Sequence, residues 1–538
     1  MSSPNDSQRK QTKPIAIKCW LVGGGTAILA AAVHLIQEAR IPGQQIHIFE
    51  IHSHSGHETT NYGNPESGYT VHAGIQPSFH EPCTQHFLSL VPYPCEPKRT
   101  LLEVCESRGL VVDNQQAWTR LLHQSHSGPA RMETSRMHMR LKDQIDLATF
   151  LLENEEKLGD RSIRQCFDPT FFDSKFWIIW STTFAIQPQH SAAEFQRHLS
   201  KYLDRIEYLN GPHIMGHIQY MFRDSVLVPT LEFLKRSGVT FQKYENAEIS
   251  FDKQSEGNST VSRIKLITVD GSSDTVSVKP TDCVIASLGP SSSISVLGSH
   301  RRPPTRELRV VDCDNGDSWA LWHQLSIESR QFGNPANFSS RLSESKLVTF
   351  TITLRSPFFL RLYMGLTNNE PGTGAFTTVA DSSWHLTINI PRQPVFPDQP
   401  QSIQIIWGYG MSPEKDGDYI AKPMYACSGE EIMFELLAHL RFPAGAILPT
   451  TTLIPCILPY ATSALLTRRP GDRPPIIPSG FGNLALVGQF VDIPNDTTFS
   501  MDYNIRSAQI AVYQLMGLNL KSPAPSRSYF MKIFDILK

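Results

Sequence analysis

Residues 15–50 have the sequence IAIKCWLVGGGTAILAAAVHLIQEARIPGQQIHIFE. The apolar run 15–22 predicts a strand, the glycines after it predict a tight turn, and the Ala-rich run 27–39 predicts a buried helix. Ile41-Pro42-Gly43 would end this helix, and 45–49 predicts a second strand. The order strand, helix, strand predicts a βαβ unit, from which parallel sheets covered by helices are built.

The glycine turn has the chemistry of a phosphate-binding loop. Gly23 and Gly25 lie where the strand meets the helix, and backbone N–H groups there can approach a pyrophosphate. Ile28 replaces the third glycine of the dinucleotide fingerprint, and Glu50 ends the second strand, where a carboxylate can bind ribose hydroxyls. This predicts binding of FAD or NAD rather than NADP. The alternative is a plain α/β turn with a coincidental Glu. The predicted cofactor-binding residues of this unit are Gly23, Gly25, Thr26, Ala27 and Glu50.

Two later segments repeat the strand-to-glycine pattern. The apolar run 282–289 ends in Gly289, and LALVGQ at 484–489 leads to a helix candidate at 505–515. Runs on both sides of Asp270-Gly271-Ser272 predict a hairpin. Junctions so far apart in sequence suggest one nucleotide-binding domain assembled from separate pieces. The 484–489 junction is either the element that approaches a flavin ring or another strand of the sheet.

The composition excludes several classes of protein. The chain has 538 residues, is 40% hydrophobic and has a net charge of −2, which favours a large core and disfavours a nucleic-acid binder. Its nine cysteines are scattered and never spaced C-x-x-C, which argues against disulfide scaffolds and thiolate zinc sites. No window resembles a signal peptide or a membrane span, so a cytoplasmic protein is expected.

Two further features leave alternatives open. His52, His54 and His57 could bind a metal, but no acidic or Cys partner recurs at ligand spacing, so a polar loop and no metal are expected. The aromatic run WIIWSTTFAIQP at 177–188 predicts either a core helix or the wall of an apolar substrate tunnel. In the tunnel alternative Trp180, Phe184 and Gln187 would bind the substrate.

Several long segments resemble the oleate hydratase family, also called the myosin-cross-reactive antigen family. They include GNPESGY at 63–69, FWIIWSTTFAIQPQHSAAEF at 176–195, WGYGMSPEKDGDYIAKPMYACSGEEI at 407–432 and LALVGQFVDIPNDTTFSMDYNIRSAQIAVY at 484–513. The resemblance covers about residues 15–515 and is far more specific than the glycine motif. It implies an FAD-binding protein that adds water to an isolated cis double bond of an unsaturated fatty acid, without net redox change. Some relatives isomerise fatty-acid double bonds instead.

The resemblance also implies the site residues. An unactivated alkene needs a proton donor at one carbon and a water held at the next. The family supplies a Glu in an R-G-G-R-E-M signature and a Tyr in a Y-N-Q-Y-D-S signature. The resemblance further implies that Gly74, Ile75, Gly289, Gly488, Gln489 and Thr498 contact the cofactor and that Asn389 contacts the substrate.

This chain departs from the family at the catalytic positions. The first signature falls on 72–77, HAGIQP, where Gln76 replaces the carboxylate. A neutral amide can hold a water but cannot take its proton. Glu81 is the nearest acid and is either a substitute base or a solvated loop carboxylate. The second signature falls on 220–225, YMFRDS, whose Tyr220 is either the proton donor or a structural residue.

These residues predict an α/β fold with a discontinuous Rossmann-like FAD-binding domain, a helical insertion and a mixed α/β substrate-binding region. The FAD-binding domain is assigned to 14–97, 225–300 and 450–520, the mostly helical insertion to 98–224 and the substrate-binding region to 301–449. Residues 1–13 are expected to be a disordered arm, and 521–538 a tail helix that packs on the body or contacts a membrane weakly.

Three functions follow as hypotheses: a hydratase with an altered acid–base set, a flavoenzyme with changed chemistry such as double-bond isomerisation, and a non-catalytic lipid- or FAD-binding protein. The expected partner is an unsaturated fatty acid, and a homodimer is possible.

Overall fold

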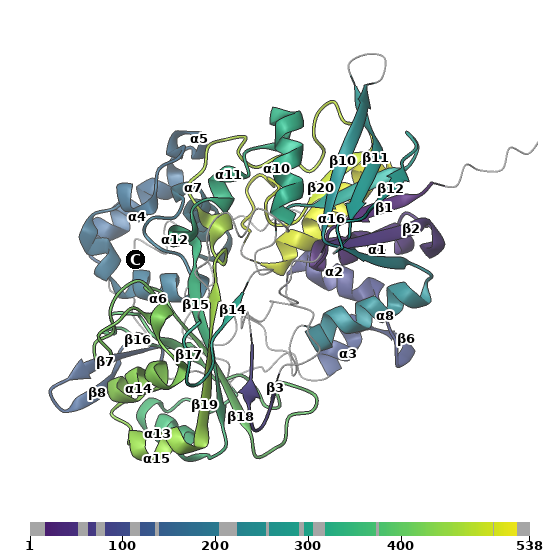
Figure 1. The fold of residues 1–538 in the computed structure, drawn as a ribbon. Helices are drawn as coiled ribbons and strands as arrows, with labels where there is room; N and C mark the ends of the chain where they lie inside the picture. The colour runs from purple at the N-terminus through teal and green to yellow at the C-terminus, as the bar shows by residue number, and fades with distance from the viewer. Residues whose placement is uncertain are drawn as a thin grey trace, which may run out of the picture.

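The computed structural model describes residues 17–51, 63–71, 81–107, 119–134, 139–203, 223–253, 258–268, 270–289, 295–304, 318–372, 376–498 and 500–523. The predicted arm at 1–13 and the apolar part of the tail lie outside these residues. Two large sheets organise the described part of the chain, with helices packed on each (Figure 1).

The first sheet is the predicted Rossmann-like sheet. Its five strands run parallel in the order β20-β13-β1-β2-β9. From β1 the chain builds outward through β2 and β9, then returns to the other side of β1 for β13 and β20. This is the doubly wound arrangement, and its direction reverses between β1 and β13. The bounds are β1 Cys19–Val22, β2 Ile46–Ile51, β9 Thr240–Tyr244, β13 Cys283–Ser287 and β20 Leu484–Val487.

Three helices lie side by side against this sheet. They are α1 (Thr26–Gln37), α2 (Pro82–Leu90) and α16 (Met501–Leu515). The Ala-rich sequence of α1 is buried from Ala27 to Leu35, because small side chains let it pack closely against the strands and α16. Helices α3 (Leu101–Ser107) and α8 (Val228–Arg236) complete this part of the chain, beside the short strands β5 (Pro92–Tyr93) and β6 (Glu96–Thr100).

The predicted hairpin around Gly271 is confirmed, but it does not belong to the parallel sheet. Strands β10 (Asn246–Lys253), β11 (Ser259–Ile267) and β12 (Ser273–Ser277) form their own antiparallel sheet. Helix α10 (Ser318–Glu328) packs on β10, where the Gln324 amide bonds the backbone N–H and C=O of Ile249 at 3.1 and 3.0 Å. These elements share one core with the parallel sheet.

The second sheet has eight strands in the order β14-β19-β15-β18-β17-β16-β7-β8. It crosses the predicted domain boundaries: β7 and β8 lie in the segment expected to be mostly helical, and β19 lies in the segment assigned to FAD binding. The reason is strand pairing, because β19 pairs with β15 over its whole length. The bounds are β7 Leu121–Ser125, β8 Gly128–Met132, β14 Val296–Leu297, β15 Leu347–Leu354, β16 Phe376–Val379, β17 Thr387–Asn389, β18 Gln404–Gly410 and β19 Thr451–Leu458.

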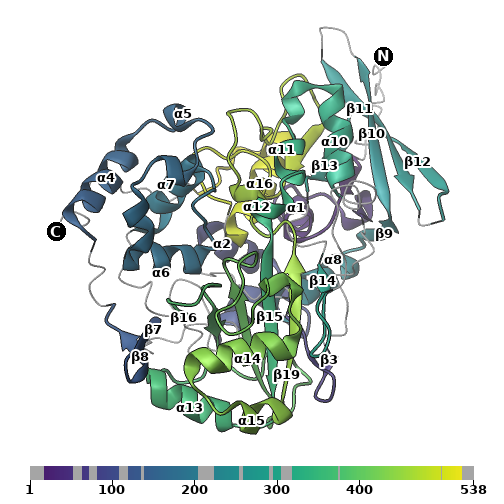
Figure 2. The ribbon, with the colours of Figure 1, turned by 60° about the vertical axis from the view of Figure 1, so that its left-hand side comes forward.

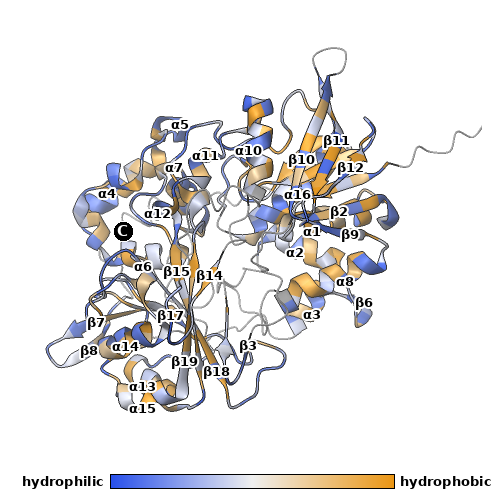
Figure 3. Cartoon of the chain, viewed as in Figure 1, coloured by the Kyte–Doolittle hydropathy of each residue, from blue (hydrophilic) through white to orange (hydrophobic). Residues whose placement is uncertain are grey.

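Helices cover both faces of the eight-stranded sheet (Figures 1 and 2). One face packs on α13 (Phe358–Thr367), α14 (Gly429–Leu440) and α15 (Ala444–Ile447), and the other on α6 (Lys175–Phe184) and α7 (Ala192–Tyr202). Helix α4 (Leu141–Leu152) packs on α7. In Figure 3 the central strands are mostly in the hydrophobic colour, whereas α4 carries both hydrophobic and hydrophilic colours. The remaining elements are β3 (Gly63–Asn64), β4 (Gly68–Tyr69), α5 (Glu155–Leu158), α11 (Ala336–Ser339) and α12 (Leu342–Ser345).

Among the described residues, no helix is both long and apolar enough to cross a membrane.

Candidate functional site

The carboxyl ends of the five parallel strands form one edge, here called the carboxyl edge, and the glycine turn lies on it. Gly25 caps α1 with φ +81°, and the Gly23 N–H bonds the Phe49 carbonyl at 2.9 Å, which ties the turn to β2. Gly24 and Gly25 are exposed, and a Cβ on either would meet nothing within 4 Å. The N-terminus of α1 is therefore open, with room for an anion such as a pyrophosphate.

The other predicted junctions lie on the same edge. A Cβ on Gly23 would lie 3.0 Å from the Ser287 Cβ, so the absent side chain lets the ends of β1 and β13 approach. Gly289 has φ +53°, and a Cβ there would lie 2.9 Å from the Phe490 ring. This edge, at the point where strand order reverses, is where doubly wound sheets bind their ligands.

The other predicted cofactor residues of the described chain lie at or near this edge. Glu50 is buried near the end of β2. The Gly488 N–H donates to the Ser507 Oγ at 2.9 Å, and this bond connects the end of β20 to α16. The predicted residues Gly23, Gly25, Thr26, Ala27, Glu50, Gly289, Gly488 and Gln489 all lie at or next to the ends of these strands, and Thr498 is buried in the connection to α16.

Several predicted site residues lie outside the described part of the chain. They are Gly74, Ile75, Gln76 and Tyr220, together with the three histidines at 52, 54 and 57.

Glu81 is the N-cap residue of α2 and is buried, so the expectation of a solvated loop carboxylate is wrong. Its exposed fraction is 3%. The reason is a pair of partners from the end of α7: the Lys201 Nζ lies 3.1 Å from the Glu81 Oε1, and the Tyr202 hydroxyl donates to the same oxygen at 3.1 Å. The Glu81 Oε2 has no hydrogen-bond partner among the described residues. Glu81 therefore keeps one carboxylate oxygen available for a further donor.

A larger group of charges surrounds Glu81. The Lys201 Nζ lies 3.1 Å from the Asp496 Oδ1, and the Arg506 Nε lies 2.8 Å from the other oxygen of Asp496. Asp502 accepts from the Thr84 backbone N–H at 2.8 Å, which fixes the start of α2 against the start of α16. We call Glu81, Lys201, Tyr202, Asp496, Asp502 and Arg506 the acid cluster. Because it lies at the start of α16, which follows β20, it borders the carboxyl edge.

The acid cluster changes the proton affinity of its members. Burial alone would lower the pKa of Lys201, but Tyr202, Glu81 and Asp496 outweigh it and raise this pKa well above its ordinary value. Burial and the charge of Glu81 raise the pKa of the Tyr202 hydroxyl. Lys201 thus keeps its positive charge and Tyr202 keeps its proton over the physiological range.

Sequence reasoning missed Lys201, Tyr202 and Asp496. Helix α7 places Glu194, Arg197 and Lys201 at i, i+3 and i+7, which is one helical face. Such a charged stripe normally faces solvent, but here it faces inward. Glu194 is 1% exposed and lies 2.7 Å from Arg468 and 3.0 Å from Arg473. The spacing of these charged residues is visible in the sequence, but only tertiary contacts show that this face of α7 points into the protein.

A row of aromatic rings leads to the acid cluster. The Trp180 and Phe184 rings lie 4.9 Å apart, and the Phe184 and Tyr202 rings 5.0 Å apart. All three side chains are buried, which supports the core-helix alternative for α6. The same row ends at the hydroxyl that touches Glu81, so apolar and acid–base groups meet at Tyr202.

The remaining predicted substrate residues border the same core. The Gln187 Nε2 donates to the Met411 carbonyl at 2.9 Å. Asn389 pairs with Trp407 across β17 and β18, and directly opposed residues share a face of the sheet. Met411 and Trp407 both belong to the core that contains Trp180 and Phe184. Contact of these residues with a substrate stays a prediction.

Comparison with known proteins identifies a family and two relatives that this chain resembles. The sequence profile of the MCRA family matches residues 16–513. An oleate hydratase of Streptococcus pyogenes serotype M49 (strain NZ131) is 31% identical over 513 residues, which cover 93% of this chain and 85% of that protein. A linoleate hydratase of Lactiplantibacillus plantarum is 25% identical over 555 residues, covering 95% of this chain and 96% of the relative.

Among solved structures, an oxidoreductase from Methanosarcina mazei aligns with a TM-score of 0.49 and 12% identity, over 92% of this chain and 100% of that one. The family profile spans nearly all of the sequence, and a relative above 30% identity covers most of it. The resemblance inferred from the sequence is confirmed: this chain belongs to the MCRA family.

Proposed function

We propose that the chain is a hydro-lyase of the oleate hydratase type, which adds water to a cis double bond of an unsaturated fatty acid. Its family and its hydratase relatives support this class of reaction. The observation that carries the proposal is the buried Glu81–Tyr202 contact at the end of the aromatic row, beside the carboxyl edge. Glu81 would thus supply a carboxylate to a chain that has Gln76 in place of the family's Glu.

The carboxyl edge fits the dinucleotide that the family implies. The open N-terminus of α1, with N–H groups of Gly25 and Thr26, would hold the pyrophosphate of FAD, and Glu50 would hold a ribose. Glycine at position 25 adopts a φ of +81° and leaves the end of the helix open, which supports this placement. When bound, FAD would supply a planar wall and a fixed electrostatic field.

The reaction then needs one proton donor and one base. Tyr220 would give its proton to one alkene carbon, water would attack the neighbouring carbon, and Glu81 would take the proton that this water releases. Gln76 would hold the water, and the proton on Glu81 would return to Tyr220 through solvent. Each turnover consumes one fatty acid and one water: the π bond of the alkene and one O–H bond of water break, and one C–H and one C–O bond form. Tyr202 is a positioning residue, because its hydroxyl orients Glu81.

The first prediction concerns the base. FAD-loaded protein should convert oleate or linoleate in heavy water into a hydroxy acid with one carbon-bound deuterium, detected by mass spectrometry. Glu81→Gln should lower the rate by about 10²- to 10⁴-fold, because it removes a general base. The exposed Glu156→Gln is the matched control and should be unchanged. Gln76→Glu should raise the rate by restoring the family carboxylate.

Two results would contradict this proposal. A product of unchanged mass with a moved double bond would identify an isomerase. Fatty-acid binding without any product, in the native protein and in Gln76→Glu, would identify a binding protein. Contact of the tail 521–538 with membranes and formation of a homodimer are separate proposals, tested by liposome flotation and by the mass of the protein in solution.

A further inference from the structure

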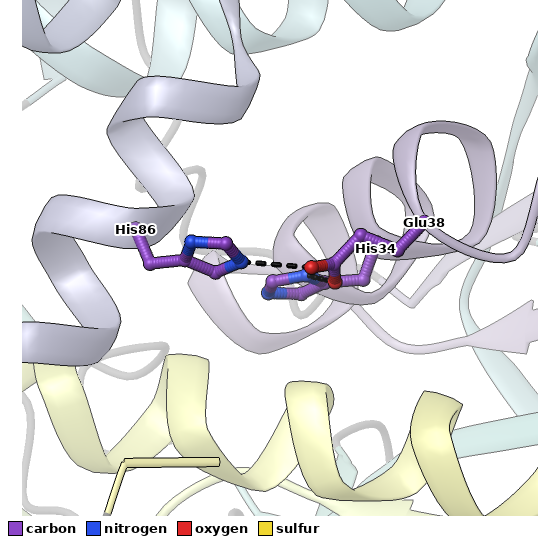
Figure 4. A group of neighbouring side chains, drawn as sticks. All are labelled: His34, Glu38 and His86. Atoms are coloured by element: carbon purple, nitrogen blue, oxygen red, sulfur yellow. Dashed lines mark hydrogen bonds and ion pairs between the residues drawn. The ribbon is translucent and has the colours of Figure 1, made fainter. Parts of the chain in front are cut away.

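A second group of potential ligands lies at the other end of α1. His34 is in the last turn of α1, Glu38 caps this helix, and His86 lies on α2 (Figure 4). The Glu38 Oε2 lies 2.6 Å from the His34 Nδ1, and the Glu38 Oε1 lies 2.8 Å from the His86 Nε2. One ligand atom from each residue lies within 4.8 Å of the others. His34 lies eight residues after Thr26, where α1 begins, or about 12 Å along the helix axis. The group is therefore separate from the carboxyl edge.

We propose that His34, Glu38 and His86 form a binding site for a divalent transition metal, with Zn²⁺ as the best match. Two imidazole nitrogens and one carboxylate oxygen are a donor set that Zn²⁺ accepts, with a water as fourth ligand. In a tetrahedral site neighbouring ligand atoms lie about 3.3 Å apart, so an ion needs only small side-chain rotations to enter.

The surroundings favour a cation at this position. The C-terminus of α1 carries the negative end of its helix dipole, which stabilises positive charge. The two oxygens of the Glu38 carboxylate face the two imidazoles, so a cation between these groups would meet all three potential ligands.

The proposed site is open to solvent on one side, and its carboxylate is held in place. The His34 side chain is fully buried, whereas the His86 side chain is 39% exposed, so the group opens to solvent on one side. The Tyr513 hydroxyl on α16 donates to the Glu38 Oε1 at 3.0 Å and so fixes the carboxylate from behind. A bound ion would join α1 to α2, with α16 holding the carboxylate in place.

A comparison within the chain shows why this group is distinctive. Asp418, Glu435 and His439 also bring three potential ligands together. There Glu435 accepts three backbone N–H groups, from residues 418, 419 and 420, at 2.7 to 2.9 Å. That carboxylate is committed to holding a loop. The Glu38 carboxylate instead bonds the side chains of His34, His86 and Tyr513, and the two histidines are potential ligands themselves.

The test uses untagged, FAD-loaded, full-length protein that has been stripped of metal with a chelator. Calorimetric titration with Zn²⁺ should show one site per chain. His86→Gln should weaken it by at least about 100-fold, since even second-shell changes cost 10- to 100-fold. Because His86 is partly exposed, this variant should fold normally. The matched control is His126→Gln, an exposed histidine in the β7–β8 turn, which should bind like the native protein.

A spectroscopic readout makes the result decisive. Co²⁺ in place of Zn²⁺ should give the visible absorption of a tetrahedral site in the native protein and in His126→Gln, and should lose it in His86→Gln. Tyr513→Phe should weaken Zn²⁺ binding by about 10-fold. Absence of a site in the native protein, or equal binding by His86→Gln and His126→Gln, would overturn the proposal. None of these readouts depends on turnover of fatty acid.

Discussion

Gly25 and Gly271 share the same positive φ, but only Gly25 lies at the proposed cofactor site. Both have φ +81°, and a Cβ on either would meet nothing within 4 Å. Alanine at either position should cost about 1 kcal/mol, because L residues avoid this conformation. Only Gly25→Ala would place a methyl group at the proposed pyrophosphate site, so its FAD affinity should fall by about 10-fold or more. Titration of the flavin-free variants with FAD checks this, and equal affinities would place the pyrophosphate elsewhere.

At the same scale, residues on a short local motif could be predicted and those brought together by tertiary contacts could not. Gly23, Gly25 and Glu50 belong to one βαβ unit whose spacing carries the chemistry. Glu81 was singled out as the acid nearest to Gln76, but its burial depends on Lys201, which is 120 residues away in sequence. The His34–Glu38–His86 group likewise joins two helices, and only the i, i+4 half of it is visible in the sequence.

Helix α7 is the element that positions the acid cluster, and Glu194 anchors it. Burial alone would raise the pKa of Glu194, but Arg473, Arg468 and Arg197 outweigh it and lower this pKa to about 2. A carboxyl with a lowered folded-state pKa stabilises the fold above its ordinary pKa, and this stability is lost as pH falls from 4.5 toward 2. Glu38 should contribute in the same window, because its pKa is also lowered to about 2.

Glu194→Gln should therefore destabilise the protein by about 3 to 5 kcal/mol near neutral pH, since it leaves buried arginines without their central partner. The deficit relative to the native protein should shrink as pH falls below about 4. Urea unfolding across pH measures both, with the exposed Glu156→Gln as a control that should follow the native curve. A deficit that stays constant with pH would show that Glu194 acts through packing rather than charge.

At the scale of the whole molecule, two sheets and their helices surround one functional edge. Strands β1, β13 and β20 could be predicted because each is an apolar run that leads to a glycine, and β2 because it completes a βαβ unit, whereas the largely polar β9 carries no such signal. The extent of the eight-stranded sheet could not, because β7 pairs in parallel with β16 across more than 250 residues. The run TTLIPCIL of β19 is as apolar as a parallel strand, and its partner β15 decides which sheet it joins. Strand pairing, not local sequence, sets the domain boundaries here.

Arg120 connects the eight-stranded sheet to helix α6. It precedes β7, and its guanidinium donates to the Thr378 Oγ1 at 2.6 Å and to the Thr182 Oγ1 of α6 at 2.7 Å. Arg120 is 1% exposed and forms no ion pair with a carboxylate in the part of the chain that the structure describes. Burial lowers its pKa to about 10, against the opposing effect of Tyr409 and Tyr363. The side chain is therefore charged at neutral pH but held by neutral oxygens.

These contacts predict that replacing Arg120 with Met costs less stability than replacing it with Lys, although Lys is chemically closer to Arg. The hydroxyl of Thr182 also donates to the Ile178 carbonyl at 2.6 Å, so removing Arg120 leaves this donor satisfied. Arg120→Met removes a buried charge and should cost about 1 to 2 kcal/mol, whereas Arg120→Lys keeps the charge without the planar fork and should cost about 2 to 4 kcal/mol. Urea unfolding ranks the two variants. If Lys proves better tolerated than Met, the positive charge itself is required, and an anion that approaches this core, such as a fatty-acid carboxylate, becomes the explanation to test.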